Sequence, residues 1–270
     1  MKSVRVDNQT RYFAEDGAGP PLIVIHGSMS SYRQWQSLAD RLRDRYRLIM
    51  LDLLICDPES KKLGAFTFAN DCAFMTALID DHPGAHLLGH SYGGVVAIKA
   101  AMARPDKLAS LVLIEPSCFH LLKQERLPEY QEVIRLQTQQ REHEARGDPA
   151  QAARSFIEYW IGPAGWDAMP ERRKELMALG LPKLNEDWPG TLDDHTHLAD
   201  YHALSTPTLL MRAKDTRAPS FRIAELLRTA LPKPTFVEIA NGGHMSPLTN
   251  PAPVNAAVDA FLTKQTVPAH

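Results

Sequence analysis

The sequence has few cysteines, and none is placed as a disulfide or metal motif requires. Cys56, Cys72 and Cys118 are odd in number, widely spaced and without a CxxC pair. This pattern argues against a disulfide framework and against a thiolate zinc site. We therefore expect three reduced, buried thiols.

Long apolar segments are also missing. No run approaches the ~20 residues that a membrane-spanning helix needs, and residues 1–7 contain no apolar signal core. The sequence predicts neither secretion nor a membrane partner. We expect a cytoplasmic protein.

There is no block of charge of one sign. The chain of 270 residues carries 30 Lys and Arg against 32 Asp and Glu, a formal net charge of -2, and 44% of its residues are hydrophobic. This is the composition of an ordinary globular protein. Without a basic patch or tail, nucleic acid is not an expected partner. We expect a small-molecule substrate, and the composition leaves the oligomeric state unknown.

Apolar strand patterns alternate with helical patterns along most of the chain. Continuous apolar runs predict buried strands at residues 22–25, 46–51, 85–88, 108–114, 208–211 and 235–239. Helical spacing lies between them, for example at residues 32–42, 95–103 and 254–262. Strand, helix, strand is a parallel crossover, so the predicted fold class is α/β, with a doubly wound, mostly parallel sheet.

The alternation stops after Pro116 for roughly 80 residues, through which only helical patterns occur. A segment of that length is too long for a loop. We expect a core formed by residues 1–116 and 205–270, with residues 117–204 inserted as a helical cap.

A G-x-S-x-G motif stands where the strand at 85–88 runs into a helix, in Gly89-His90-Ser91-Tyr92-Gly93. Such a strand-turn-helix holds a nucleophilic serine on a strained turn at the edge of a sheet. The glycines let neighbouring chain pass close to that turn. Ser91 is the predicted nucleophile, and the backbone N–H of Tyr92, at the helix start, is a predicted oxyanion donor.

A serine needs a histidine base that is oriented by a carboxylate. His244 follows a predicted late strand in the glycine-rich loop Asn241-Gly242-Gly243-His244 and is the predicted base. Two carboxylates follow strands: Asp215 and Glu115. We favour Asp215, because a short carboxylate on a post-strand loop is the commoner arrangement in such folds, with Glu115 as its rival.

With these residues the whole chain resembles an α/β-hydrolase with a helical cap, on His26-Gly27, the Ser91 motif, Asp215 and Gly243-His244. The resemblance implies a second oxyanion donor, the backbone N–H of Ser28, and a structural role for His26 in bracing that loop. It implies no cofactor.

One segment departs from the family pattern. Similar proteins have Asp-x-x-Gly-x-Gly-x-Ser after the strand that ends at Leu51, whereas both glycines are absent from residues 52–60 here. Because this loop borders the oxyanion side of the site, substrate contacts known from relatives do not carry over to it.

Histidines and carboxylates between Asp193 and His202 suggest a metal site at first sight. The spacing differs from the His-x-His-x-Asp-His of metallo-hydrolases, and a fold with that motif has no serine elbow. We assign no metal.

Trp160, Trp166 and Trp188 all fall in the predicted cap. Any single one is expected to pack the cap, and together they suggest an apolar cavity over Ser91. The predicted function is a serine hydrolase that cleaves a small, mostly apolar ester-like substrate through an acyl-enzyme. Alternatives on the same residues are a thioesterase, a carbon-carbon bond hydrolase, a perhydrolase or cofactor-free haloperoxidase, or a catalytically silent fold that binds a ligand.

Overall fold

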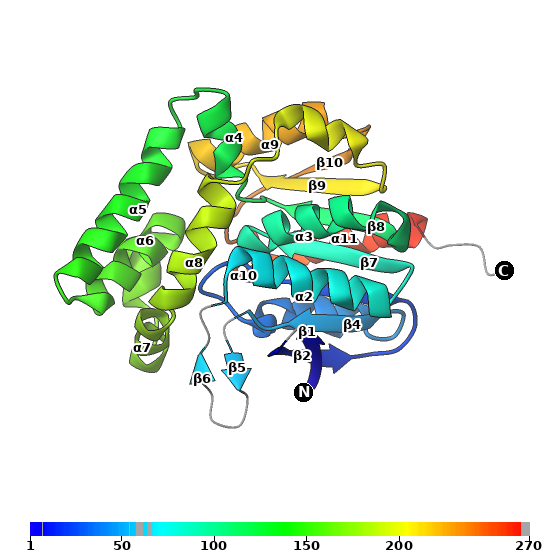
Figure 1. The fold of residues 1–270 in the computed structure, drawn as a ribbon, viewed down its shortest axis with the longest axis horizontal. Helices are drawn as coiled ribbons and strands as arrows, with labels where there is room; N and C mark the ends of the chain where they lie inside the picture. The colour runs from blue at the N-terminus through cyan, green and yellow to red at the C-terminus, as the bar shows by residue number, and fades with distance from the viewer. Residues whose placement is uncertain (7, 54, 58–61, 64–65, 266–270) are drawn as a thin grey trace.

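A single eight-stranded sheet forms the centre of the protein in the computed structural model, which describes residues 1–6, 8–53, 55–57, 62–63 and 66–265 (Figure 1). In sheet order, the strands are β1 (Lys2–Val6), β2 (Gln9–Asp16), β4 (Arg47–Leu51), β3 (Pro21–Ile25), β7 (Ala85–His90), β8 (Leu108–Ile114), β9 (Thr208–Ala213) and β10 (Thr235–Ile239). From β4 to β10 all neighbours are parallel, whereas β1 and β2 pair antiparallel at one edge. The predicted mostly parallel α/β sheet is confirmed.

The central strands are buried on both faces, as their continuous apolar runs predict. Ile23 and Ile25 of β3 pack into the cluster on one face, whereas Leu22 and Val24 pack into the cluster on the other. This alternation follows from the two-residue period of a strand. Because the strands from β4 to β10 run in the same direction, their carboxyl ends lie at one edge of the sheet, where the loops that follow can build a site.

Helices cover both faces of the sheet. The face that contains Ile23 packs against α2 (Phe68–Asp81) and α3 (Tyr92–Ala103), and the other face packs against α1 (Gln36–Leu42) and α11 (Pro251–Lys264). The remaining short or peripheral helices of this part are η1 (Tyr32–Trp35), η2 (Pro105–Lys107), α9 (Ala218–Ala230) and α10 (Ser246–Thr249). The layers are those of a doubly wound fold.

The chain between β8 and β9 is helical, and residues 115–207, all of them described, contain no strand. This segment comprises α4 (Phe119–Gln124), α5 (Tyr130–Ala145), α6 (Pro149–Asp167), α7 (Glu171–Leu179), α8 (Leu181–Leu192) and η3 (Leu198–Ala203). Figure 1 shows α5, α6 and α7 standing to one side of the sheet. The segment is helical, as its sequence patterns predict, and α8 continues through Pro189 although proline disfavours a helix interior.

The glycine-free segment 52–60 lies partly outside the described residues, which omit Leu54 and residues 58–60. Its described part includes β5 (Ile55–Asp57), which pairs antiparallel with β6 (Lys62–Leu63). This hairpin is separate from the main sheet.

Candidate active site

Ser91 lies on a sharp turn between β7 and α3, as the motif predicts. Its backbone has φ 55° and ψ −123°, a conformation that L-residues rarely adopt. The backbone N–H of Ser91 donates to the carbonyl of Ile114 at the end of β8. The backbone N–H of Ser117 donates to the carbonyl of Ser91, so β8 and the residues after it hold the strained turn in place.

The glycines around Ser91 are required by close backbone approach. A Cβ on Gly89 would lie 2.3 Å from the carbonyl oxygen of Gly93, and a Cβ on Gly93 would lie 2.5 Å from that of His26. Both distances are shorter than any side chain tolerates. The turn therefore packs directly against its own helix and against the loop after β3.

Three side chains form a hydrogen-bonded chain at the edge of the sheet. Ser91 Oγ lies 2.8 Å from His244 Nε2, and His244 Nδ1 lies 2.8 Å from Glu115 Oε2. All three are buried: His244 is 3% exposed and Glu115 1%. This arrangement can move the serine proton to an imidazole whose charged form is stabilised by a carboxylate.

The preference for Asp215 as the carboxylate beside His244 is wrong. Asp215 is exposed beyond the end of β9, whereas Glu115 leaves β8 with φ 43° and points at the imidazole. Glu115 also accepts from the backbone N–H of Ala213 at 2.7 Å and from the Thr216 hydroxyl at 2.6 Å. The longer glutamate side chain spans from β8 to the His244 loop, so the shorter side chain offers no advantage.

His90, the variable residue before Ser91, fixes the loop that carries His244. Its Nε2–H donates to the carbonyl of His244 at 2.8 Å, and Nδ1 accepts from the side-chain amide of Gln34 at 3.1 Å. Burial lowers the pKa of His90 well below its ordinary value, and the neighbouring His244 lowers it further. His90 is therefore neutral and acts as a brace, a role that the sequence did not indicate.

The loop after β3 lies beside the serine, as expected for an oxyanion loop. His26 braces it: Nε2 accepts from the backbone N–H of Leu53 at 2.9 Å, and Nδ1–H donates to the carbonyl of Gly27 at 2.8 Å. Burial lowers the pKa of His26 and keeps it neutral. Ser28 lines the cavity beside Ser91, and Tyr92 is the first residue of α3, where backbone N–H groups have no helical partner. The oxyanion role of these two N–H groups stays a prediction.

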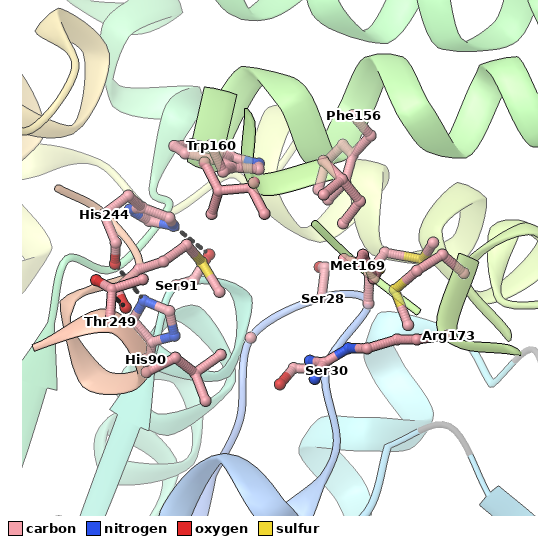
Figure 2. A pocket seen from close by; sticks show the side chains of 18 of the residues that line it. Ser28, Ser30, His90, Ser91, Phe156, Trp160, Met169, Arg173, His244 and Thr249 are labelled. Carbon is pink, nitrogen blue, oxygen red and sulfur yellow. Dashed lines mark hydrogen bonds between the residues drawn. The ribbon is translucent and has the colours of Figure 1, made fainter. Parts of the chain in front are cut away.

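A cavity of about 360 Å³ opens above Ser91 (Figure 2). Ser91 and His244 line it together with residues of α6 and α7, among them Trp160 and Met177, and with Met169 between these two helices. Most of the lining is apolar, with Arg173 as its charged residue. This matches the apolar cavity that the sequence suggests.

A second, much smaller cavity of about 20 Å³ also reaches Ser91. It shares Ser28, Phe156 and Trp160 with the large one, but His244 does not line it. Its polar lining comprises Ser28, Ser91, Tyr92, Ser117, Asp187 and Thr191.

The three tryptophans of the helical segment take different positions. Trp160 stacks on His244, with ring centroids 3.9 Å apart and planes at 27° (Figure 2). A kink at Gly162, with φ 75°, follows it in α6. Trp188 is buried and lines the small cavity, and Trp166 is buried without lining either. Trp166 packs the segment without lining a cavity, whereas Trp160 and Trp188 both pack the segment and line a cavity at Ser91.

A buried ion cluster lies behind the oxyanion loop, and no sequence motif indicates it. Arg11 and Lys183 both contact Asp71, at 2.5 and 2.9 Å, and Lys183 also pairs with Asp187 one helical turn along α8. Ser28 Oγ donates to Asp187 Oδ2 at 2.6 Å. The cluster balances two positive charges against two negative ones, as buried charges require.

Burial dominates the titration of Asp187. It raises the pKa of this carboxyl to about 6, although the Lys183 ammonium acts to lower it. Burial acts to lower the pKa of Lys183, but Asp187 and Asp71 outweigh it and raise that pKa. The pair is ionised at neutral pH.

Of the described residues, Cys72, Cys118 and the histidine-rich segment line neither cavity. Cys118 is buried and Cys72 half-buried, and burial raises the pKa of each thiol to about 12; the side chain of Cys56 lies outside the described residues. In the segment 193–202, Asp194 binds Lys99 and Thr196. Within the described ranges, no three His, Cys, Asp or Glu side chains could hold a metal ion, and no helix has the length and apolarity to cross a membrane.

Residues 22–257 match the sequence model of the alpha/beta hydrolase family, which is most of the chain. This protein belongs to that family. The structure of MGS-M2, an alpha/beta hydrolase from a deep-sea metagenome library, shares this fold, with a TM-score of 0.78 over 100% of both chains at 18% identity. A thermophilic esterase from Thermogutta terrifontis superimposes on the α/β hydrolase described here with a TM-score of 0.74, covering 96% of this chain and 94% of that one at 23% identity.

Two sequence relatives of this α/β hydrolase are named as a hydrolase and as an esterase. The Pseudomonas syringae protein named "Putative carbamate hydrolase RutD" is 27% identical over 91% of this chain and 95% of its own. A pimeloyl-[acyl-carrier protein] methyl ester esterase of Aliivibrio fischeri is 32% identical over 40% of this chain and 41% of its own. The family and these relatives identify the chain as an enzyme, a hydrolase.

Proposed function

We propose that this protein is a serine hydrolase that cleaves a small, mostly apolar ester-like substrate through an acyl-enzyme. The observation that carries the proposal is the chain of 2.8 Å contacts from Ser91 through His244 to Glu115 at the side of a 360 Å³ cavity. The names of the relatives, a carbamate hydrolase and a methyl ester esterase, add support because both describe hydrolysis of a carboxylic or carbamic acid derivative.

In the proposed reaction, Ser91 Oγ attacks the carbonyl carbon while His244 Nε2 takes its proton. Glu115 holds the imidazole by its Nδ1–H and stabilises the imidazolium. The backbone N–H groups of Ser28 and Tyr92 stabilise the tetrahedral oxyanion. His244 then gives its proton to the leaving alkoxide oxygen, and the alcohol departs.

Water completes the cycle. His244 takes a proton from a water molecule, the resulting hydroxide attacks the acyl carbon, and Ser91 leaves with that proton. The other product is the carboxylic acid. The reaction needs no cofactor or metal.

In this proposal, residues 117–204 act as a cap on a core of residues 1–116 and 205–270. Side chains of α6 and α7 form one wall of the cavity and exclude water from it. Trp160 belongs to this wall and lies directly on the catalytic imidazole.

The test combines covalent labelling with turnover. A fluorophosphonate should label the wild type at Ser91, and benzyl acetate should be hydrolysed. Ser91→Ala should abolish labelling and lower turnover by at least about a thousandfold while keeping the melting temperature within a few degrees, since the hydroxyl contributes little packing. Labelling at Ser91 without ester turnover would favour the catalytically silent fold, and undiminished turnover by Ser91→Ala would refute the nucleophile.

A further inference from the structure

Two cavities of unequal size meet at Ser91, and the position of His244 decides which part of a substrate enters each. His244 must protonate the leaving oxygen, so the leaving alcohol has to lie on its side. His244 lines the large cavity and not the small one. The alcohol part therefore occupies the large cavity. The carbonyl oxygen faces the N–H groups of Ser28 and Tyr92, which line the small cavity, and the acyl substituent is directed into the remainder of that cavity, toward Asp187 and Thr191.

The small cavity limits the acyl substituent to very few atoms. Its volume is about 20 Å³, and a single water molecule requires about 10–15 Å³ on this measure. Two of its lining side chains, Trp188 and Phe119, are buried, and Trp188 Nε1 donates to Gln140, which fixes the position of that ring. A substituent of one or two non-hydrogen atoms fills it.

Part of the wall is strongly hydrogen-bond accepting. Asp187 lines the cavity, and its carboxylate accepts from Ser28 and pairs with Lys183. A carboxylate has about four acceptor positions, so this one keeps capacity for a further donor. The Thr191 hydroxyl donates to the Trp188 carbonyl and offers its lone pairs as well.

The charge of the wall selects the kind of donor. Lys183 neutralises Asp187, and Arg11 neutralises Asp71 behind it, so the cluster has no net negative charge. A cation entering the cavity would lose its water without finding an unpaired counter-ion. A neutral O–H or N–H loses less and still meets a charged acceptor.

We infer that the small cavity is an acyl subsite for a substituent of one or two non-hydrogen atoms that carries a neutral O–H or N–H group, with Asp187 as its acceptor. This inference rests on the proposed function and narrows its substrate class. Hydroxyacetyl esters are the simplest probe, since HO–CH2 and CH3–CH2 have nearly the same size and differ in the donor.

The experiment compares benzyl hydroxyacetate, benzyl propionate and benzyl acetate at pH 8, with kcat/KM for each divided by its rate constant for hydroxide hydrolysis. This division removes the difference in intrinsic reactivity. The corrected hydroxyacetate-to-propionate ratio should be about tenfold or more, the size expected for a hydrogen bond to a charged acceptor. A corrected ratio of one or below, with benzyl acetate turned over, overturns the inference and leaves the proposed function intact. Failure of all three esters together with absent fluorophosphonate labelling refutes the proposed function instead.

Variants assign the preference to Asp187. Lys183→Met with Asp187→Leu removes both charges together and leaves Arg11 and Asp71 paired, so no unpaired charge is buried. The corrected ratio should fall to about one. If the double variant only disturbed the loop that carries Ser28, kcat/KM for the hydroxyacetate and for the propionate would fall by the same factor, and their ratio would stay that of the wild type. The matched control, Arg154→Gln with Glu158→Gln, removes another pair of the same helical spacing, which lies far more exposed on α6, and should retain the wild-type ratio.

If the double variant does not fold, Asp187→Asn replaces it. The neutral amide oxygen is a weaker acceptor, so the ratio should fall by at least about threefold. A wild-type ratio in either folded variant overturns the assignment to Asp187.

Discussion

The indole of Trp160 lies flat on the imidazole of His244, at a ring distance of 3.9 Å. The two residues come from different parts of the fold, α6 of the helical segment and the loop after β10. An aromatic face attracts a cation held over it. In the proposed reaction, this stack would stabilise the imidazolium that forms when His244 takes the serine proton.

Replacing Trp160 tests this contact. Trp160→Leu should lower kcat for benzyl acetate about tenfold, the range expected for a desolvated cation-π contact, and Trp160→Phe should recover part of the loss. Steady-state kinetics beside a thermal melt provide the measurement. Trp166→Leu is the control: it removes a buried tryptophan of the same helix that lines neither cavity, and it should cost stability without changing kcat. Equal losses of kcat in both variants would contradict a specific role for Trp160.

The contact of Glu115, and not Asp215, with His244 predicts which of two variants loses more activity. Glu115→Gln should lower kcat about a thousandfold or more, because an amide neither fixes the imidazole tautomer nor stabilises its charge. Asp215→Asn should stay within about twofold of the wild type, since Asp215 is exposed and Glu115 occupies the His244 contact. Kinetics on both variants check this order, and a larger loss in Asp215→Asn would mean that the His244 loop rearranges during turnover.

The two cavities predict opposite effects of lengthening the two halves of an ester. Along a series of acetate esters, kcat/KM should rise by at most about fourfold per methylene of the alcohol, which corresponds to about 0.8 kcal/mol, until the 360 Å³ cavity is filled. Along a series of benzyl esters, butyrate should be at least about tenfold worse than acetate, because the acyl cavity has only 20 Å³. An increase with acyl length would show that the two halves bind the other way round.

The buried carboxyl of Asp187 predicts a pH-dependent contribution to stability. Its pKa of about 6 in the folded protein lies above the ordinary value of 3.8, so the folded state holds this proton more tightly than the unfolded state. The stability that the protonated Asp187 carboxyl contributes to the folded state is fully present below pH 3.8 and is lost as the pH rises through 6. The free energy of unfolding of the wild type minus that of Asp187→Asn should thus be larger at pH 4.5 than at pH 7, by about 2 kcal/mol. Urea unfolding at both pH values measures it, and a difference of the opposite sign would contradict a raised pKa.

The sequence alone determined the sheet, the helical insertion and the serine elbow. Strands buried on both faces, such as β3 and β8, read as continuous apolar runs, and this signal is local. The elbow at Ser91 is also visible as a short motif: Gly89 is required by the close approach of Gly93, four residues along the chain, although Gly93 itself packs against His26 after β3. Patterns of this kind can therefore be recognised in the sequence without the structure.

The tertiary structure alone decided which carboxylate meets His244 and what surrounds Ser91. Glu115 and Asp215 both follow strands that end at the same edge, and only the paths of the loops bring Glu115 to the imidazole. The pairing of Ser28 with Asp187 joins residues 159 positions apart. Buried ion pairs such as Lys183 and Asp187 leave no periodic trace in a sequence, because their charges match through space and not along the chain. The fold is set by short-range patterns, whereas the chemistry of the cavity depends on long-range contacts that the packing of the helical segment creates.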